Sequence, residues 1–262
     1  MTNRIGDVHI SHDGFVAIVT IDKPPINAVS VDLMRDLADA LEGLDRDGVT
    51  RAVVLATAGK VFCSGADLTR RADEIGIAAK DAAAGNPLYD QAVRLFSTEL
   101  PIVVAVQGAA VGAGLGLALV GDFRVAAPEA RFAANFTKLG FHPGFGLTYT
   151  LPRLVGRQHA ARMFLTGDRF DAEAAVAMGL VDEVAPLDQL MVRATAVAGA
   201  IAENAPLAVR STRKTLRGDL AAAVRAQTDH EFFEQQWLMK TDDFREGVKA
   251  VGERRRGEFR GR

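Results

Sequence analysis

The clearest candidate for chemistry in this chain is a glycine-rich turn in the middle of the sequence, Gly112-Ala113-Gly114. The β-branched run Ile102–Val106 precedes it and is typical of a buried strand. Residues 115–120 follow it and are apolar throughout, which predicts a helix buried in the core. Such a turn presents free backbone N–H groups at the start of a buried helix, where they favour a negative oxygen. The stretch therefore indicates an oxyanion hole; the alternative is a tight strand-to-helix turn without chemistry.

The composition is that of a globular protein. Hydrophobic residues make up 48% of the 262 residues and charged residues 24%. The net charge of −2 provides no global field for nucleic acid or an anionic membrane, so we expect neither partner. The single cysteine, Cys63, excludes an internal disulfide framework, and we expect it to be buried and inert rather than a nucleophile. The sequence shows neither a secretory signal nor a membrane-spanning run, which predicts a cytoplasmic protein.

Strands and helices alternate before and after the glycine-rich turn. Two apolar runs around His12-Asp13-Gly14 predict a hairpin. Ser30 followed by leucines at helical spacing predicts a helix, and residues 52–56 predict a buried parallel strand. Because a helix between two such strands forms a βαβ unit, this part of the chain predicts an α/β fold.

Beyond residue 204 the strand patterns stop. Residues 207–216, 220–240 and 244–253 are each predicted to be helical, with Asp242-Asp243 as the N-terminal cap of the last helix. We therefore expect a core of residues 1–204 and a helical region of residues 205–262. The arginines at 254–256 are typical of a solvated tail, and a phosphate contact is the alternative.

Four stretches together resemble the crotonase superfamily, the enoyl-CoA hydratase/isomerase family. The resemblance implies a crotonase (ClpP-like) spiral of ββα units with a C-terminal helical trimerisation region, assembled as a trimer or a dimer of trimers. It implies an acyl-CoA thioester as ligand, with coenzyme A present as part of the substrate and no separate cofactor or metal. In family order the stretches are Asp22-Lys23-Pro24-Pro25-Ile26-Asn27-Ala28, Val61-Phe62-Cys63-Ser64-Gly65-Ala66-Asp67-Leu68, residues 104–122, and residues 165–181.

The resemblance also implies that the backbone N–H groups of Ala66 and Ala113 polarise the thioester carbonyl. This agrees with the oxyanion interpretation of the turn, because an enolate oxygen needs donors that are in place before charge develops. Lys60 is the expected cation for coenzyme A. Contacts with the substrate are implied less specifically for a larger set: Lys23, Ile26, Ala28, Lys60, Asp67, Leu68, Gly112, Phe136 and Tyr149. For Tyr149 the alternative is core packing.

The chain departs from the family pattern wherever a catalytic carboxylate is usual. Hydratases of this family carry two glutamates, and the matching positions here are Gly116 and Phe136. Some isomerases carry an aspartate at the position of Gly144. Hydration needs a base that activates water and a proton donor, so we do not expect an efficient two-glutamate hydratase. Isomerisation of a double bond needs one base and no water, so we expect an isomerase-type reaction through an enolate.

His142 is the expected acid–base group, because it lies in the right loop and histidine titrates near neutral pH. The alternative is a loop histidine that faces solvent or caps a helix. Glu74 and Tyr89 are further candidates, whereas Asp67 beside an oxyanion donor is expected to be structural. Other functions stay open: a hydrolase or decarboxylase variant, and a protein that binds acyl-CoA without turnover. A dinucleotide site in the glycine-rich turn is disfavoured, because no acidic ribose ligand follows at the expected spacing.

Overall fold

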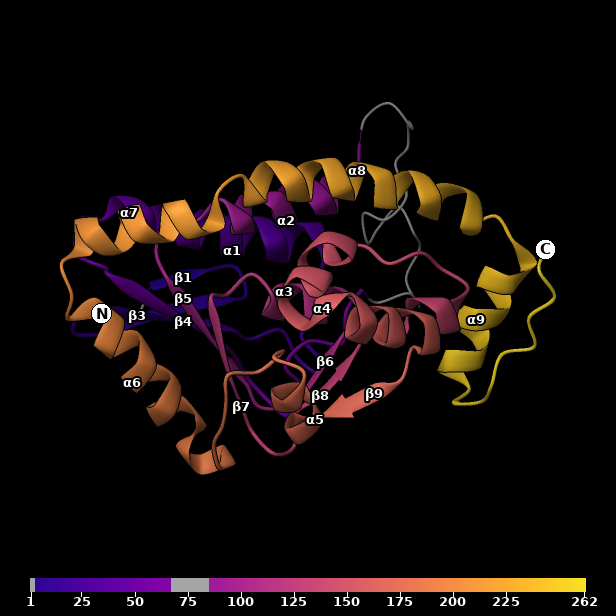
Figure 1. Cartoon of the computed structure of the whole chain (residues 1–262), viewed down its shortest axis with the longest axis horizontal. Coiled ribbons are helices and arrows are strands. Elements are labelled where there is room, and N and C mark those ends of the chain that lie inside the picture. The colour runs from indigo at the N-terminus through magenta and orange to yellow at the C-terminus, as the bar shows by residue number, and fades with distance from the viewer. Residues whose placement is uncertain (1–2, 67–84) are drawn as a thin grey trace.

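The computed structural model describes residues 3–66 and 85–262. In this part of the chain a seven-stranded sheet has the order β1-β2-β3-β4-β5-β7-β10 (Figure 1). β1 to β3 pair antiparallel and the remaining neighbours pair parallel, which confirms the predicted hairpin and the predicted parallel strand. The strands are β1 (Asn3–Ile5), β2 (Val8–Asp13), β3 (Val16–Ile21), β4 (Ala52–Thr57), β5 (Ile102–Val106), β7 (Phe123–Ala126) and β10 (Glu183–Val184).

Helices cover both faces of the large sheet. Alternate residues of β4 and β5 face a core with α1 (Val31–Arg46) and α2 (Pro87–Phe96) on one side, and α6 (Leu190–Ala202) on the other. This explains why β4 and β5 are apolar without alternation, as expected of strands buried on both faces. α1 begins as predicted at Ser30, whose hydroxyl oxygen accepts the Leu33 N–H at 3.3 Å.

A second, three-stranded sheet carries the glycine-rich turn. It consists of β6 (Ala109–Val111), β8 (Arg131–Ala133) and β9 (Arg169–Asp171), in the order β6-β8-β9. β6 ends directly before Gly112, and α3 (Ala113–Ala118) follows. The remaining elements around this sheet are η2 (Asn135–Leu139), α4 (Leu147–Thr166), α5 (Ala172–Ala177) and η3 (Leu187–Gln189).

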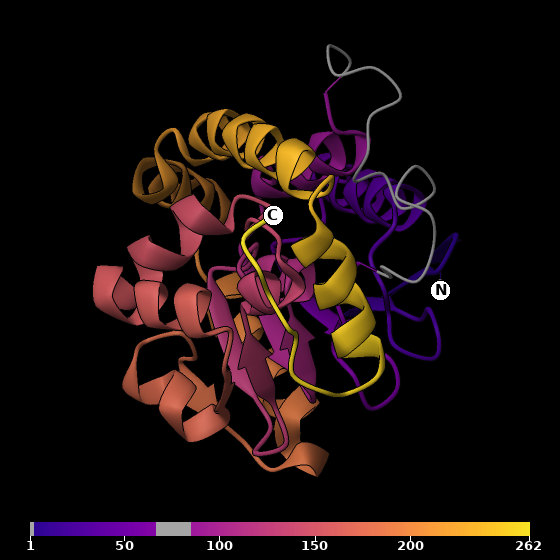
Figure 2. The same cartoon turned by 90° about the vertical axis from the view of Figure 1, so that its right-hand side faces the viewer.

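The last three helices are α7 (Pro206–Arg217), α8 (Leu220–Leu238) and α9 (Asp242–Gly252). α8 lies along α2, and α9 turns back over η2, where Figure 2 shows it facing the viewer. The predicted cap of α9 was wrong: Thr241 is the cap, and its hydroxyl oxygen accepts the Phe244 N–H at 3.1 Å. Asp242 instead lies in the first turn, where a negative charge stabilises the helix start. No helix in the described part of the chain is long and apolar enough to cross a membrane.

Candidate active site

The glycine-rich turn leaves one backbone donor, the Ala113 N–H, without an acceptor inside the helix that follows. Gly112 has φ 55° and ψ −122°, a conformation that glycine adopts without penalty. Its carbonyl accepts the Gly116 N–H at 3.2 Å, inside the first turn of α3. Because the C=O and N–H of a trans peptide point in opposite directions, the Ala113 N–H points out of the start of the helix. As the first helical residue, Ala113 has no carbonyl one turn earlier to accept it.

A second backbone donor comes from the turn that ends at Ala66. The carbonyl of Gly65 accepts the Val29 N–H at 2.9 Å. By the same peptide geometry, the Ala66 N–H points away from Val29. The two turns approach closely, since a Cβ placed on Gly65 would lie 2.7 Å from the Val111 carbonyl oxygen and 3.5 Å from the Ala113 nitrogen. A side chain at position 65 would therefore push the two turns apart, and glycine there allows both donors to lie close together.

Short backbone pairing locks the two turns in this position. The Cys63 N–H donates to the carbonyl of Ala109 at 2.9 Å, and the Val111 N–H donates to the carbonyl of Cys63 at 3.0 Å. A Cβ on Gly114 would lie only 2.2 Å from the Cys63 carbonyl oxygen, so this glycine is also required by close packing. The donors are thus fixed by backbone rather than by mobile side chains, which is the preorganisation that an oxyanion hole needs.

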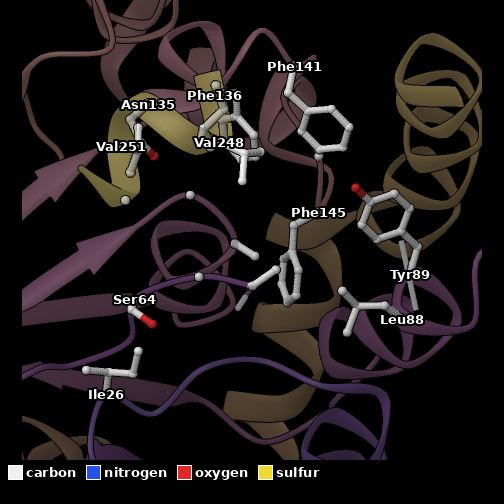
Figure 3. Close-up of a pocket in the computed structure, with 17 residues that line it drawn as sticks. Ile26, Ser64, Leu88, Tyr89, Asn135, Phe136, Phe141, Phe145, Val248 and Val251 are labelled. Carbon is white, nitrogen blue, oxygen red and sulfur yellow. The ribbon is translucent and has the colours of Figure 1, made fainter. Parts of the chain in front are cut away.

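Both donor residues line one cavity of about 240 Å³ (Figure 3). Among the described residues that line it there is no carboxylate, imidazole or ammonium group. The polar side chains in this set are Ser64, Tyr89 and Asn135, and the Ser64 hydroxyl has no hydrogen-bond partner in the described part of the chain. The lining residues are Ile26, Ser64, Gly65, Ala66, Leu88, Tyr89, Gly112, Ala113, Asn135, Phe136, Leu139, Phe141, Gly144, Phe145, Val248, Val251 and Gly252.

Neighbouring side chains fill the space beside two of the carboxylate positions. A Cβ on Gly116 would lie 2.6 Å from a ring carbon of Phe145, which is fully buried. A Cβ on Gly144 would lie 2.0 Å from the hydroxyl oxygen of Tyr89. The third position, Phe136, contributes its ring to the cavity wall. At Gly116 and Gly144 the chain therefore lacks not only the carboxylate but also the room for one without a shift of the neighbouring ring.

A buried polar network on α8 holds the loop that carries these residues. One carboxylate oxygen of Glu231 accepts the Gly146 N–H at 2.7 Å, and the other accepts the N–H and the hydroxyl of Thr148 at 2.9 and 2.6 Å. Burial raises the pKa of Glu231 to about 7. Gln235 accepts a hydrogen bond from the Tyr89 hydroxyl at 2.8 Å. Burial, with the charge of Glu231 as a smaller cause, raises the pKa of Tyr89, which keeps this phenol neutral.

Sequence reasoning missed Glu231 and Gln235. The hydrogen bonds of Glu231 reach residues 83 and 85 positions earlier, and no motif joins such distant residues. One signal was present: Thr228, Glu231 and Gln235 lie on one face of a helix at spacings of three and four, and all three are fully buried. Polar residues on the inner face of a helix need buried partners, and these partners are the loop before α4.

The structure does not bring His142 to the cavity of the two donors. His142 lines a separate hollow with Trp237 and Thr241, and its ring contacts that of His230 with centroids 6.0 Å apart. Its Nδ1 lies 2.8 Å from the carbonyl oxygen of Pro143. The side chain thus lines a hollow other than the cavity of the two donors. The geometry gives no support to His142 as the acid–base group, and we do not retain that role for it.

The other expected contact residues fall into two groups. Ile26, Gly112 and Phe136 line the cavity, with Ala66 and Ala113. Tyr149 does not: it packs partly against the core under the Arg153 guanidinium, 5.1 Å from its ring centroid, as the alternative interpretation held. Asp67, Leu68 and Glu74 lie outside the described residues.

Lys23, Ala28 and Lys60 lie outside the cavity lining. Lys23 donates from Nζ to the Ser30 hydroxyl at 2.7 Å, Ala28 is half-buried, and Lys60 is exposed. Their contacts with coenzyme A stay predictions. Burial raises the pKa of the Cys63 thiol to about 11, so it stays protonated at neutral pH and suits the inert role expected of it.

The model of the enoyl-CoA hydratase/isomerase family matches residues 12–262. The chain belongs to this family. A probable enoyl-CoA hydratase of Mycobacterium tuberculosis is 40% identical over 225 residues, which cover 86% of each chain. These two matches confirm the resemblance to the crotonase superfamily. As a member of this family, the chain is an acyl-CoA-binding protein.

Solved structures of this family confirm the predicted crotonase fold, including the helical C-terminal region. The enoyl-CoA hydratase/isomerase of Pseudoalteromonas atlantica superposes with a TM-score of 0.86 at 32% identity, covering 97% of this chain and 100% of that one. The carnitinyl-CoA hydratase of Mycobacterium avium superposes with a TM-score of 0.85 at 31% identity, covering 99% and 100%.

Similarity within the family does not choose the reaction. From Escherichia coli, a 1,2-epoxyphenylacetyl-CoA isomerase is 32% identical over 94% of this chain and 95% of its own length, and a 2,3-dehydroadipyl-CoA hydratase is 33% identical over 98% and 100%. These family members are about equally similar to the chain and differ in the reaction that they are named for. The choice between isomerase and hydratase therefore depends on the site itself.

Proposed function

We propose that this protein is an enzyme that isomerises the acyl group of a coenzyme A thioester through an enolate, and that it is not a two-glutamate hydratase. The observation that carries the proposal is the pairing of two fixed backbone donors, Ala66 and Ala113, with a cavity in which the ring of Phe145 fills the space beside Gly116. The donors favour enolate formation, and the filled position disfavours the addition of water.

The proposed reaction places the thioester oxygen between the two N–H groups. A base removes a proton from a carbon of the acyl chain next to the unsaturated system, and the electron pair moves to the oxygen, where the donors stabilise the enolate. Return of the proton to a different carbon shifts the double bond without a net gain or loss of atoms. In the sequence, Glu74 stays the carboxylate candidate for this proton transfer.

Hydration would need more than this site offers. Water has to reach the β carbon next to a base, and a second group has to supply a proton to the α carbon. In the described part of the cavity the Tyr89 phenol is committed to Gln235 and stays neutral. The space beside Gly116 holds an aromatic ring that gives water no hydrogen bond.

The test compares two reactions of the same enzyme preparation. A 3-enoyl-CoA reports isomerisation as a gain of absorbance from the conjugated thioester, and a 2-enoyl-CoA reports hydration as a loss of it. We expect isomerisation to be faster by at least tenfold. Hydration at an equal or higher rate would refute the proposal.

A protein that binds acyl-CoA without turnover is the second candidate. It is favoured by the absence of any base among the described residues that line the cavity. Calorimetric binding of acyl-CoA together with no turnover in either assay or in a thioester-hydrolysis assay would select it. Thioester hydrolysis or decarboxylation as the main activity would instead select the hydrolase or decarboxylase variant.

We further propose that residues 205–262 mediate self-association, as a trimer or a dimer of trimers, in the cytoplasm and without a cofactor beyond coenzyme A. Support comes from large apolar side chains exposed on α7 and α8, including Leu207 at 82% and Phe233 at 65% exposure. Sedimentation analysis tests the assembly, and a monomer at micromolar concentration would contradict it.

A further inference from the structure

Aromatic side chains dominate the acyl end of the cavity. We infer that the site selects an uncharged aryl acyl group and that Phe145 is the residue that determines this selectivity. The inference rests on the proposed function, because it assumes that an acyl-CoA thioester occupies the cavity. It is carried by the backbone of Phe145, the placement of the surrounding rings, the size of the cavity and the lack of charged side chains among the described residues that line it.

The backbone of Phe145 has φ 65°, in the left-handed region. A bulky aromatic residue rarely adopts this conformation, and such strain persists only where the surrounding structure imposes it. Gly146 on its C-terminal side also has positive φ, and its N–H is held by the buried carboxylate of Glu231. The result is a fully buried ring that lies against Gly116 and forms part of the cavity wall. A strained position that holds one ring in the wall of the substrate cavity points to a role for that ring.

Other aromatic side chains lie around the same space, as Figure 3 shows for Phe136, Phe141 and Tyr89. Two of them are supported by further rings outside the cavity. Tyr89 meets Phe232 edge-on with centroids 6.4 Å apart, and Phe141 meets Phe244 with centroids 5.2 Å apart. The lining rings are therefore held in place before a ligand arrives. A substrate ring would find edge-to-face or offset-stacked partners, and such pairs strengthen binding by a few-fold to about tenfold beyond burial alone.

The size of the cavity fits a single ring with a short connection. A cavity of about 150 Å³ lined by apolar side chains is known to hold benzene. The cavity here measures about 240 Å³. The remainder of roughly 90 Å³ corresponds to the liquid volume of about three water molecules. It is enough for a carbonyl and a methylene between the ring and the sulfur, and too little for a long straight acyl chain.

The described lining of the cavity disfavours acyl groups that end in a carboxylate. Among the described lining residues no side chain is cationic, and Tyr89 and Asn135 are neutral. An acyl carboxylate would lose its water without gaining a paired charge, which is strongly unfavourable. The expected acyl group is therefore apolar at its far end.

The experiment measures affinity with esters that do not react. Phenylacetyl-CoA, cyclohexylacetyl-CoA and adipyl-CoA are titrated calorimetrically into the full chain, with free coenzyme A as the reference. We expect phenylacetyl-CoA to bind a few-fold more tightly than cyclohexylacetyl-CoA, which has a similar shape without the π system, and at least tenfold more tightly than adipyl-CoA. In Phe145→Leu the preference for phenyl over cyclohexyl should be clearly lower than in the wild type.

Phe132→Leu is the matched control, because Phe132 is equally buried but does not line the cavity. It should keep the wild-type preference. Should Phe145→Leu fail to fold, Phe141→Leu changes a second lining ring and should lower the same preference. Equal affinity of the wild type for phenyl and cyclohexyl esters, or an unchanged preference in the Phe145 variant, overturns the inference and leaves the proposed function standing. Esters that bind no better than free coenzyme A overturn both.

Discussion

The oxyanion interpretation is tested most directly by removing one backbone donor, and Ala113→Pro does this with little damage to the fold. Ala113 is the first residue of α3, so the loss of its N–H breaks no helical hydrogen bond. Proline is favoured at this position, where its fixed φ suits the helix. The preceding residue, Gly112, has ψ −122° and so lies outside the helical region that proline disfavours.

The expected magnitude follows from the role of the donor. Removal of one oxyanion-hole donor costs about 10²–10³ in kcat, or about 3–4 kcal/mol. The free energy of unfolding should change by less than about 1 kcal/mol, because substitution to proline at a compatible position acts mainly on the unfolded chain. The variant is thus predicted to lose activity while it keeps its stability. A variant that loses activity through misfolding would lose both.

The assay measures kcat and KM for 3-enoyl-CoA isomerisation alongside urea unfolding. Ala113→Ser serves as the control, because it adds one oxygen at the same position and keeps the N–H; its kcat should stay within about threefold of wild type, well inside the roughly 10²-fold effect of a lost donor. A folded Ala113→Pro variant with kcat within tenfold of wild type would show that this N–H does not stabilise the reacting oxygen, and the reasoning from the Gly112–Ala113 peptide would fail.

Three further predictions concern other parts of the site. Gly116→Glu should lower the free energy of unfolding in urea by about 1–3 kcal/mol, because Phe145 fills the space that the new side chain needs. For the same reason it should not create hydratase activity. A stable variant that hydrates 2-enoyl-CoA would contradict this prediction. His142→Ala should keep the isomerisation rate within about twofold, since a general acid or base contributes 10²–10⁴-fold and this side chain lies in another hollow; a loss of tenfold or more would return His142 to the mechanism. Glu231 has its pKa raised to about 7 in the folded protein, so its contribution to stability is complete below its unfolded pKa and is lost as the pH rises through 7. The test measures the free energy of unfolding of wild type and Glu231→Gln in urea at pH 4.5 and at pH 8. From the lower to the higher pH, the wild type should lose up to about 3 kcal/mol relative to the variant. A difference between the two proteins that is constant with pH would contradict the assigned pKa.

Local patterns were sufficient to predict the parts of the fold that local interactions determine. The hairpin around Asp13 and the helix that begins at Ser30 depend on turn and cap residues that are adjacent in sequence. The cap of α9 was misassigned because Thr241 and the two aspartates that follow it are all good caps, and only the backbone geometry separates them.

The site was predictable where it consists of backbone and unpredictable where it depends on side-chain direction. The resemblance to the family gave Ala66 and Ala113 as the donors, and the structure shows both at one cavity. His142 lies in the expected loop, but whether a loop side chain points in or out depends on the backbone around it. The ring of Phe145 beside Gly116 and the anchor at Glu231 arise from contacts between distant segments, which no local pattern encodes.

The participation of α9 in the cavity wall couples ligand binding to the stability of the C-terminal part of the chain. Val248 and Val251 face the cavity, and a Cβ on Gly247 would lie 2.4 Å from the backbone of Leu139, so α9 is seated tightly on η2. A ligand that contacts α9 binds only while this helix is docked, and by mass action it stabilises the docked state. Amide hydrogen exchange within α9 should slow as the acyl-CoA concentration rises, while exchange in β4, which does not line the cavity, reports global unfolding. The same coupling means that any factor that loosens α9 weakens acyl-CoA binding without touching the oxyanion donors.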